Sequence, residues 1–435
     1  MTTSEREPAG AGLALLTGGS AGELMSAVLS AAGARLLDWK VAQVDHQPGR
    51  RTTASYTARV RWADGTVSGE TLGASSGRLP AGVARLSDGE TEIGMWRFPF
   101  DPELPALRTA CDPERMRGLM KNVCLGFTGD AVRLRVRSYR PRRRAVVEIA
   151  TPDGRRVFAK IVPPAKAAAL HERHRLASAG GAAVPAALGW TDDGLVALAG
   201  LPGRTLREVL LAGDREEPDP ADVTRVLDAL PDTLATGPPR RTWGQKSRHY
   251  AEVVAAAAPE LAARARAVAA AVDHEAPEGP GVPVHGDLYE SQLMMHQGRV
   301  SGLLDIDGAG RGERLDDAGC LLAHLAVLAQ IRPDRAMAIE RLGTRLERSF
   351  TGDGHGAVDP AALARRTAAV VLSLATGPHR VQEPHWRQHT EQRVALAERW
   401  LEHASAGRHE QSFMDTAVLS SSPPENLESP LEEGK

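Results

Sequence analysis

Three polar groups stand where apolar segments of this sequence end, at spacings that suit the transfer of a phosphoryl group. The run V-P-V is followed by H-G-D, which ends in Asp287; Gln292 comes five residues later, and Asp305 closes the segment G-L-L-D. Ionised carboxylates at the ends of apolar strands need a partner or a metal ion. We predict that Asp287 orients an acceptor hydroxyl and takes its proton, and that the carbonyl of Gln292 and the carboxylate of Asp305 bind Mg²⁺.

Other polar residues of this stretch have supporting roles in the prediction. His285 is expected to pack behind the loop as a hydrogen-bonding scaffold. Asp307 fits a second metal contact and a structural role equally well. Asp317 opens an apolar helical segment, so we expect it to cap that helix rather than to act in catalysis.

One lysine and one glutamate are candidates for contact with a nucleotide. Lys160 is the one lysine inside an apolar strand-like segment, V-F-A-K-I-V, and Glu172 follows twelve residues later in a helical segment. A buried lysine needs anionic company. We predict that Glu172 pairs with Lys160 while Lys160 contacts the phosphates, as in protein kinases. The alternatives are a lysine that reaches solvent from a strand end and a glutamate on a solvated helix face.

Composition excludes several classes of protein. The chain has 435 residues, 42% of them hydrophobic, and a net charge of −2, which offers no general attraction to nucleic acid or to anionic membranes. Three widely spaced cysteines imply neither a disulfide framework nor a thiolate metal site, and no segment approaches the length of a membrane span. We therefore expect a cytoplasmic protein with no nucleic-acid or membrane partner.

The order of segments predicts an α+β molecule with two lobes. Residues 20–33 have helical spacing and residues 35–74 strand-like alternation, which returns in residues 132–162; helical patterns, including 220–235 and 247–274, dominate the rest. The two strand regions resemble a degenerate repeat, although any two hairpins with Pro-Arg turns look alike. The predicted parts are a cap subdomain, a β-rich lobe, a helical lobe and a disordered tail, at residues 1–110, 111–200, 201–408 and 409–435.

The motifs H-G-D-L-Y-E-S-Q, L-L-D-I-D and E-R-L-D-D-A resemble those of the aminoglycoside phosphotransferase superfamily, over residues 130–405. Gln292 in place of the usual Asn resembles bacterial maltokinases, as does the extra N-terminal segment, whereas D-I-D-G-A-G differs from their D-F-E-G-E-P. The chain is similar to the actinobacterial maltokinase-like group that includes glucosamine kinases. This resemblance implies a bilobal protein-kinase-like fold, ATP and Mg²⁺ as cofactors, and adenine bound at the interlobe backbone near Ala199 and Leu201.

The same resemblance places the acceptor pocket among the C-terminal helices. There the segment V-Q-E-P-H-W-R-Q-H-T-E gathers an aromatic ring, which can stack on a sugar, and carboxylates, which can hold an ammonium group. A tryptophan in the helical core beside solvated acids is the alternative. The predicted acceptor-binding residues are Asp316, Gln382, Glu383, Trp386 and Glu391.

These observations predict a monomeric sugar kinase that transfers the γ-phosphoryl group of ATP to a small sugar, glucosamine, at its 6-hydroxyl. A maltokinase or an aminoglycoside O-phosphotransferase is the first alternative and would need a longer, more open groove for its acceptor. A nucleotide-binding pseudokinase that regulates a partner is the alternative of another class. Competent residues at every catalytic position argue against it.

Overall fold

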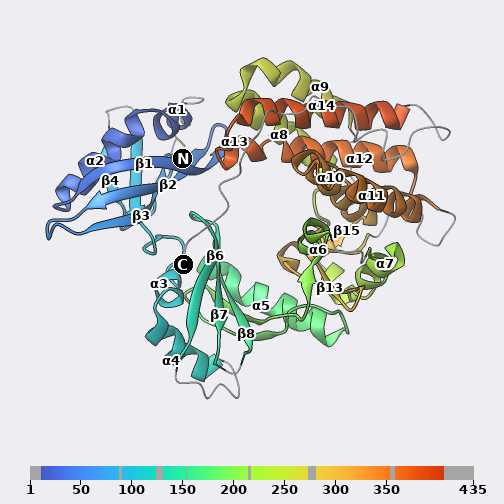
Figure 1. Cartoon of the computed structure of the whole chain (residues 1–435), viewed down its shortest axis with the longest axis horizontal. Coiled ribbons are helices and arrows are strands. Elements are labelled where there is room, and N and C mark those ends of the chain that lie inside the picture. The colour runs from blue at the N-terminus through green and yellow to red at the C-terminus, as the bar shows by residue number, and fades with distance from the viewer. Residues whose placement is uncertain are drawn as a thin grey trace.

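The computed structural model describes residues 11–87, 91–123, 131–152, 154–213, 217–272, 281–352 and 358–405. These residues form an N-terminal unit, a β-rich N-lobe and a helical C-lobe, which follow one another along the chain (Figure 1). The tail predicted at 409–435 lies outside the described residues. Among those residues, the structure contains no helix that combines the length and the apolar character needed to cross a membrane.

The N-terminal unit packs two helices on one face of an antiparallel sheet with the strand order β1-β2-β3-β5-β4 (Figure 1). Side chains alternate between the faces of a strand, so Ala54, Tyr56 and Ala58 of β2 share one face, where they pack with Leu16 and Met25 of the helices. The helix and the first three strands match the sequence prediction, and the short strands β4 and β5 extend the sheet. The elements are α1 (Ala11–Thr17), α2 (Ser20–Ala31), β1 (Arg35–Gln47), β2 (Arg51–Arg61), β3 (Val67–Ser75), β4 (Ala84–Ser87) and β5 (Glu92–Arg97).

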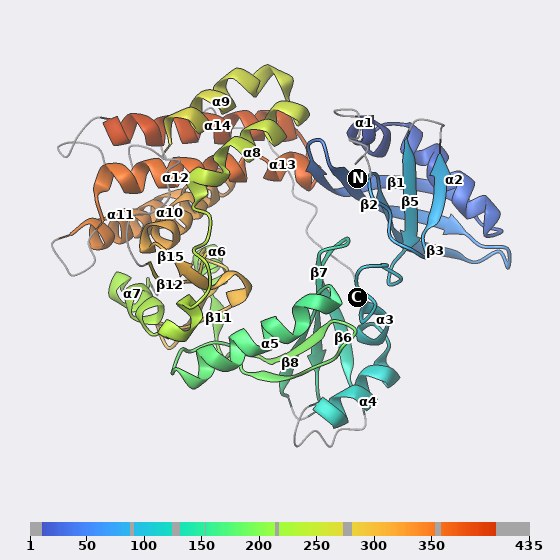
Figure 2. The ribbon, with the colours of Figure 1, turned by 180° about the vertical axis from the view of Figure 1, so that it is seen from behind.

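The N-lobe holds a second antiparallel sheet, with the strand order β6-β7-β8-β10-β9. Ala159 and Ile161 of β8 belong to the core that this sheet forms with α3 and α4. Lys160 lies between them and therefore points to the opposite face, across which α5 runs (Figure 2). The elements are α3 (Leu107–Ala110), α4 (Pro113–Val123), β6 (Arg133–Arg140), β7 (Arg144–Ala150), β8 (Arg156–Ile161), α5 (Pro164–Ala179), β9 (Ala187–Trp190) and β10 (Leu195–Ala199).

The C-lobe is built around α10, which is buried along most of its length between neighbouring helices. Two small sheets, β11-β13-β14 and β12-β15, hold the loops that carry the predicted catalytic residues. The elements are β11 (Arg204–Thr205), α6 (Leu206–Ala212), α7 (Pro220–Asp228), α8 (Trp243–Ala257), α9 (Ala262–Ala271), β12 (Val282–Val284), β13 (Leu293–His296), β14 (Arg299–Leu303), β15 (Gly310–Gly312), α10 (Arg314–Ile331), α11 (Ala336–Thr351), α12 (Pro360–Leu374), α13 (Gly377–Arg380) and α14 (Trp386–Ser405).

Two of the predicted helices are shorter than expected because prolines interrupt them. The helix predicted over 247–274 is divided at Pro259 into α8 and α9, with a short 3₁₀ turn between them. The helix predicted over 220–235 ends at Asp228, and a 3₁₀ turn follows Pro231. Proline lacks the N–H that continues a helix and clashes with the preceding turn, so a break at each position is expected.

Arg142 joins the N-terminal unit to the N-lobe. Its side chain is buried and donates from Nη1 to Ser75 Oγ at 2.8 Å and from Nη2 to Glu103 Oε1 at 2.6 Å. Its backbone N–H donates to Asp101 Oδ2 at 2.8 Å. The β6–β7 turn, in which Arg142 lies, is therefore fixed against the end of β3 and against the segment that connects the two sheets.

Candidate active site

The loop that carries Asp287 is held in place by hydrogen bonds to a buried carboxylate. Asp317, in the first turn of α10, accepts hydrogen bonds from the backbone N–H of His285 at 2.8 Å and of Gly286 at 2.7 Å. Gly286 has φ +79°, and a Cβ there would lie 2.5 Å from the guanidinium carbon of Arg240, so glycine is needed at this position. The prediction that Asp317 caps its own helix is wrong, because both of its oxygens serve the catalytic loop.

His285 acts as the predicted scaffold. Its Nε2 lies 2.7 Å from the carbonyl oxygen of Leu304, and its Nδ1 lies 3.3 Å from the backbone nitrogen of Asp287. A backbone N–H can only donate and a carbonyl can only accept, so the ring carries its proton on Nε2. The imidazole thereby joins the loop of Asp287 to the segment that leads into Asp305.

The Asp287 carboxylate has no hydrogen-bond partner among the described residues and lines a cavity of about 910 Å³. Burial raises the pKa of Asp287, and the positive charges of Arg144 and Arg140 oppose this rise. A carboxylate that is held in place and free of protein partners can accept the proton of a bound hydroxyl. The same cavity is lined by Asp307 and by arginines of the β6–β7 hairpin, namely Arg140, Arg142, Arg143 and Arg144.

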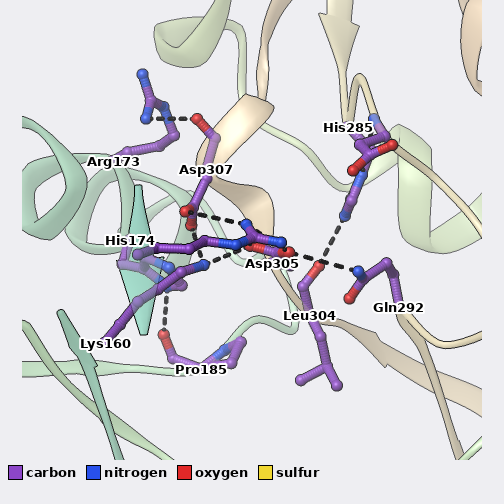
Figure 3. A network of polar contacts seen from close by, with 11 residues as sticks. Lys160, Arg173, His174, Pro185, His285, Gln292, Leu304, Asp305 and Asp307 are labelled. Carbon is purple, nitrogen blue, oxygen red and sulfur yellow. Dashed lines mark hydrogen bonds and ion pairs between the residues drawn. The ribbon is translucent and has the colours of Figure 1, made fainter. Parts of the chain in front are cut away.

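Lys160 connects the two lobes through a pair of carboxylates (Figure 3). Its ammonium donates to both Asp305 and Asp307, and Arg144 Nη1 lies 3.2 Å from Asp305 Oδ2. Burial acts to raise the pKa of Asp305, but Lys160 and Arg144 together hold it below its usual range; burial raises the pKa of Asp307. Asp305 is therefore ionised at neutral pH, which a cation-binding group requires.

The residues around Asp305 suit a magnesium ion chemically. The amide nitrogen of Gln292 lies 3.5 Å from Asp305 Oδ2, which brings both predicted metal ligands together (Figure 3). Rotating this amide by half a turn would direct its oxygen to the same place. Two carboxylates and an amide oxygen are hard ligands of the kind that Mg²⁺ takes, and an ion held by them would supply positive charge for the phosphates of ATP.

The sequence of this chain matches a known protein family. A family model described as the phosphotransferase enzyme family matches residues 142–360. The chain belongs to this family. The bilobal kinase-like fold and the use of ATP with Mg²⁺, both predicted from the motifs, are thereby confirmed, and the family acts on hydroxyl groups of small molecules.

Solved structures similar to this phosphotransferase share little sequence with it. A macrolide 2'-phosphotransferase type I is 17% identical over 65% of this chain and 96% of that chain, with a TM-score of 0.41. A choline kinase from Cryptosporidium parvum is 10% identical over 67% and 95%, with a TM-score of 0.44. An aminoglycoside phosphotransferase from Streptomyces rimosus, in complex with ADP and streptomycin, is 19% identical over 52% and 90%, with a TM-score of 0.36. No curated protein matches the chain.

In this phosphotransferase, Glu172 does not pair with Lys160, and that prediction is corrected. Its carboxylate accepts from Arg175 at 2.6 Å on the exposed face of α5. The next two residues turn inward instead. Arg173 donates to the carbonyl oxygen of Asp307 at 2.8 Å, and Nδ1 of the buried His174 lies 2.8 Å from the carbonyl oxygen of Pro185 (Figure 3).

Helix phase could have revealed this correction. The buried positions of α5 are Ala167, Leu170, His174 and Ala177, which recur at the three- and four-residue spacing of a single helix face. Glu172 is off this stripe. A histidine interrupts this otherwise apolar stripe, so the buried face of α5 is hard to recognise in the sequence.

The backbone between the two lobes, at residues 199–201, offers one N–H group that could donate a hydrogen bond to adenine. The N–H of Ala199 donates to Ala186 and that of Gly200 to Arg156, both at 2.9 Å, whereas the N–H of Leu201 has no acceptor among the described residues. Ala199 and Leu201 line a cavity of about 460 Å³ with Val157. Adenine recognition at this position remains a proposal, with the Leu201 N–H as its donor.

Two of the predicted acceptor residues have other partners. Asp316 forms a buried ion pair with Arg366 and accepts from the backbone N–H of Trp243 at 3.2 Å, so it holds α10, α12 and α8 together. Glu391 lies on the exposed side of α14, 3.0 Å from Arg264 of α9. Both predictions are corrected, because each carboxylate is paired with an arginine and neither residue lines the cavity that contains Asp287.

The other three lie around the turn between α13 and α14. Glu383 Oε2 is 2.9 Å from His389 Nδ1, and Gln382 donates to the carbonyl oxygen of His379 at 2.5 Å. Trp386 packs edge-on against the ring of His379, with centroids 4.7 Å apart. Their role in binding an acceptor stays a prediction.

Sequence reasoning missed the cations that hold this site together. Arg240 donates to the carbonyl oxygens of Gly286 and Gly308, and thus joins the catalytic loop to the segment after Asp307. Arg144 contacts Asp305 from the first position of β7. The two strands of this hairpin differ in burial: Arg135 and Arg137 of β6 are exposed, whereas Ala145 and Val147 of β7 are buried or half-buried. This difference becomes visible only when the strands are paired.

Proposed function

We propose that this phosphotransferase transfers the γ-phosphoryl group of ATP to a hydroxyl group of an amino sugar, with glucosamine as the acceptor and glucosamine 6-phosphate as the product. The observation that carries the proposal is the unpartnered carboxylate of Asp287, held next to the Lys160, Asp305 and Asp307 cluster. In the proposed reaction, the acceptor oxygen forms a bond to the γ-phosphorus, the bond to the ADP oxygen breaks, and Asp287 takes the hydroxyl proton.

Several cations of the chain support the handling of a triphosphate. Arg140, Arg143 and Arg144 line the cavity with Asp287, and Lys160 reaches the same region from β8. Positive charge placed where negative charge accumulates stabilises the transfer, and it stabilises more in a partly enclosed site than in water. In this proposal Lys160 exchanges part of its contact with the two carboxylates for contact with phosphate oxygens.

The choice of an amino sugar rests on the motif resemblance and on the surroundings of Glu383. Arg393 lies 3.7 Å from Glu383, and Arg393 and Arg380 both act electrostatically on His324, which lies next to Asp287. Through Arg393, Glu383 is therefore linked electrostatically to the surroundings of the catalytic loop. A carboxylate here could exchange its contact with His389 for the ammonium group of the acceptor, while Trp386 offers an apolar face to the sugar.

The test is ADP release from ATP and Mg²⁺ with glucosamine, glucose, N-acetylglucosamine, maltose and an aminoglycoside as acceptors. We expect glucosamine to be preferred. Glu383→Gln should raise KM for glucosamine about tenfold, in keeping with the loss of one charged hydrogen bond, and leave KM for ATP unchanged. Glu391→Gln, which alters a carboxylate paired with Arg264, is the matched control and should behave as the wild type. A preference for maltose or an aminoglycoside would keep the reaction and replace the acceptor.

A further inference from the structure

Behind Asp287, a cysteine and a histidine of α10, which phosphoryl transfer does not require, complete a cluster of possible metal ligands. Cys320 and His324 are four residues apart and so lie on the same face of the helix. One carboxylate oxygen of Asp287, the sulfur of Cys320 and a ring nitrogen of His324 all lie within 4.8 Å of one another. These are three different donor types, gathered from the catalytic loop and from α10, and Asp287 also lines the cavity of about 910 Å³.

His324 is held in place without being used. Its ring stacks on Tyr289, with centroids 4.4 Å apart and an interplanar angle of 18°. Neither ring nitrogen has a hydrogen-bond partner among the described residues, although the ring is enclosed well enough that burial lowers its pKa to about 3. An imidazole that is neutral, oriented and unpartnered has its lone pair available to a ligand.

We propose that Asp287, Cys320 and His324 form a binding site for a first-row divalent transition metal ion of the Zn²⁺ type, and that an ion bound there blocks access of the acceptor to Asp287. Zn²⁺ takes thiolate, imidazole and carboxylate ligands together, whereas Mg²⁺ prefers oxygen ligands only. The cluster around Asp305 and Gln292 would thus keep its magnesium while the second site discriminates for a softer ion. The ion binding stands by itself, and the block rests on the proposed role of Asp287.

The ligands of the cluster can neutralise the charge of a divalent ion once Cys320 is deprotonated. Arg207, Arg380 and Arg393 act on His324 and would repel a lone dication. On binding, the Cys320 thiol loses its proton to solvent, so thiolate and Asp287 carboxylate supply two negative charges against the two positive charges of the metal. Cys320 is fully buried, whereas Asp287 opens to the cavity, so the ion would enter from the acceptor side. No electron transfer is involved.

Co²⁺ added to the metal-free protein tests binding without ATP or acceptor. We expect one Co²⁺ per chain to bind with a thiolate-to-cobalt absorption band and the visible bands of a four-coordinate site, apart from any Co²⁺ held by the oxygen ligands around Asp305. Cys320→Ser should abolish the thiolate band, and His324→Gln should weaken binding at least about tenfold, since even an outer contact of a metal ligand is worth that much. Cys111→Ser, which changes the free cysteine beside α3, should leave both signals intact. The proposal is overturned if no thiolate band appears in the wild type, or if the band survives in Cys320→Ser. Thermal melting of each variant without metal identifies one that does not fold.

Inhibition by buffered Zn²⁺ tests the consequence. With MgATP in excess, Zn²⁺ should raise KM for the acceptor and leave KM for ATP unchanged, and Cys320→Ser should need at least about tenfold more free Zn²⁺ for half-inhibition. Inhibition that is competitive with ATP, or equal in wild type and Cys320→Ser, would overturn the block. If no acceptor is turned over, the proposed function fails, and the cobalt spectra still decide the metal site.

Discussion

The ammonium of Lys160 donates to the carboxylate of Asp305, and this contact joins the N-lobe sheet to the loop after β14 in the C-lobe. Asp307 accepts from the same ammonium. Both carboxylates are largely buried, so the lysine is the counter-charge on which their ionised state depends, together with Arg144.

Replacing this counter-charge should destabilise the protein in a way that Mg²⁺ relieves. Lys160→Met leaves the partly buried carboxylates of Asp305 and Asp307 beside each other without their shared cation, which costs up to the roughly 3–5 kcal/mol of unfolding free energy lost when a buried pair is broken. Added Mg²⁺ then binds the folded state and should raise Tm more in the variant than in the wild type. Lys121→Met, on the exposed surface of α4, is the control and should change stability by less than about 0.5 kcal/mol. An equal response of Lys160→Met and wild type to Mg²⁺ would contradict a cation site at Asp305.

Asp317 should act on catalysis through the loop that it holds. Asp317→Asn replaces one of the two oxygens that accept from His285 and Gly286 with an amide that cannot accept. An unsatisfied buried donor costs about 1–3 kcal/mol, so kcat should fall about tenfold or more with KM for ATP nearly unchanged.

Asp316, the residue before Asp317, provides the control variant for Asp317→Asn. Asp316→Asn weakens the buried pair with Arg366 and should lower the free energy of unfolding. It should not lower kcat per folded molecule. If steady-state kinetics give the same loss of kcat for both variants, the assignment of Asp317 to the loop fails.

The protein should lose stability as pH falls from about 6.5 to about 4, in part because of His174. Burial lowers the pKa of His174 from 6.5 to about 4, so the unfolded chain binds this proton at a higher pH than the folded one does. The stability is therefore complete above pH 6.5 and declines below it, by up to about 3 kcal/mol from this group. His174→Asn keeps a donor for Pro185 and removes the titration, so urea unfolding at pH 4.5 and 7.5 should show a smaller difference in the variant. If the stability difference between pH 4.5 and pH 7.5 is the same in His174→Asn and in the wild type, another group causes the loss of stability in acid.

The pH profile of turnover should report the raised pKa of Asp287. Burial disfavours its ionised form, so the carboxyl holds its proton to a higher pH than the ordinary value of 3.8. Because the base must be ionised to take a proton, kcat/KM for the acceptor should rise with pH through this raised pKa and then level. A profile with no acid limb above pH 3.8 would be inconsistent with Asp287 as the base.

Motif spacing was sufficient to identify the candidate catalytic and metal-binding residues that lie at the ends of strands. Asp287, Gln292, Asp305 and Lys160 stand where apolar strands stop or carry a single charge, and such positions are visible in the sequence because burial of a charge demands a reason. The bilobal fold followed from the same residues through family resemblance. The helix breaks at Pro231 and Pro259 were also legible, and were missed by reading apolar periodicity alone.

Pairings across the molecule were not predictable in this way. Glu172 follows Lys160 at a suitable distance along the chain, yet the phase of α5 turns it to solvent. Asp316 is taken by Arg366, fifty residues later, and Glu391 by Arg264, more than a hundred residues earlier. With 47 arginines in the chain, the sequence offers many partners for each acid, and only the packing of the helices selects one.

The most direct test of the account compares wild type and Asp287→Asn in a single experiment, with ATP binding and glucosamine-dependent ADP release measured on the same samples. We predict Mg²⁺-dependent release by the wild type and a loss of about 10²-fold or more in the variant, with the affinity for ATP nearly equal in both. Retained turnover in Asp287→Asn, or loss of ATP binding together with turnover, would contradict the central role given to this carboxylate.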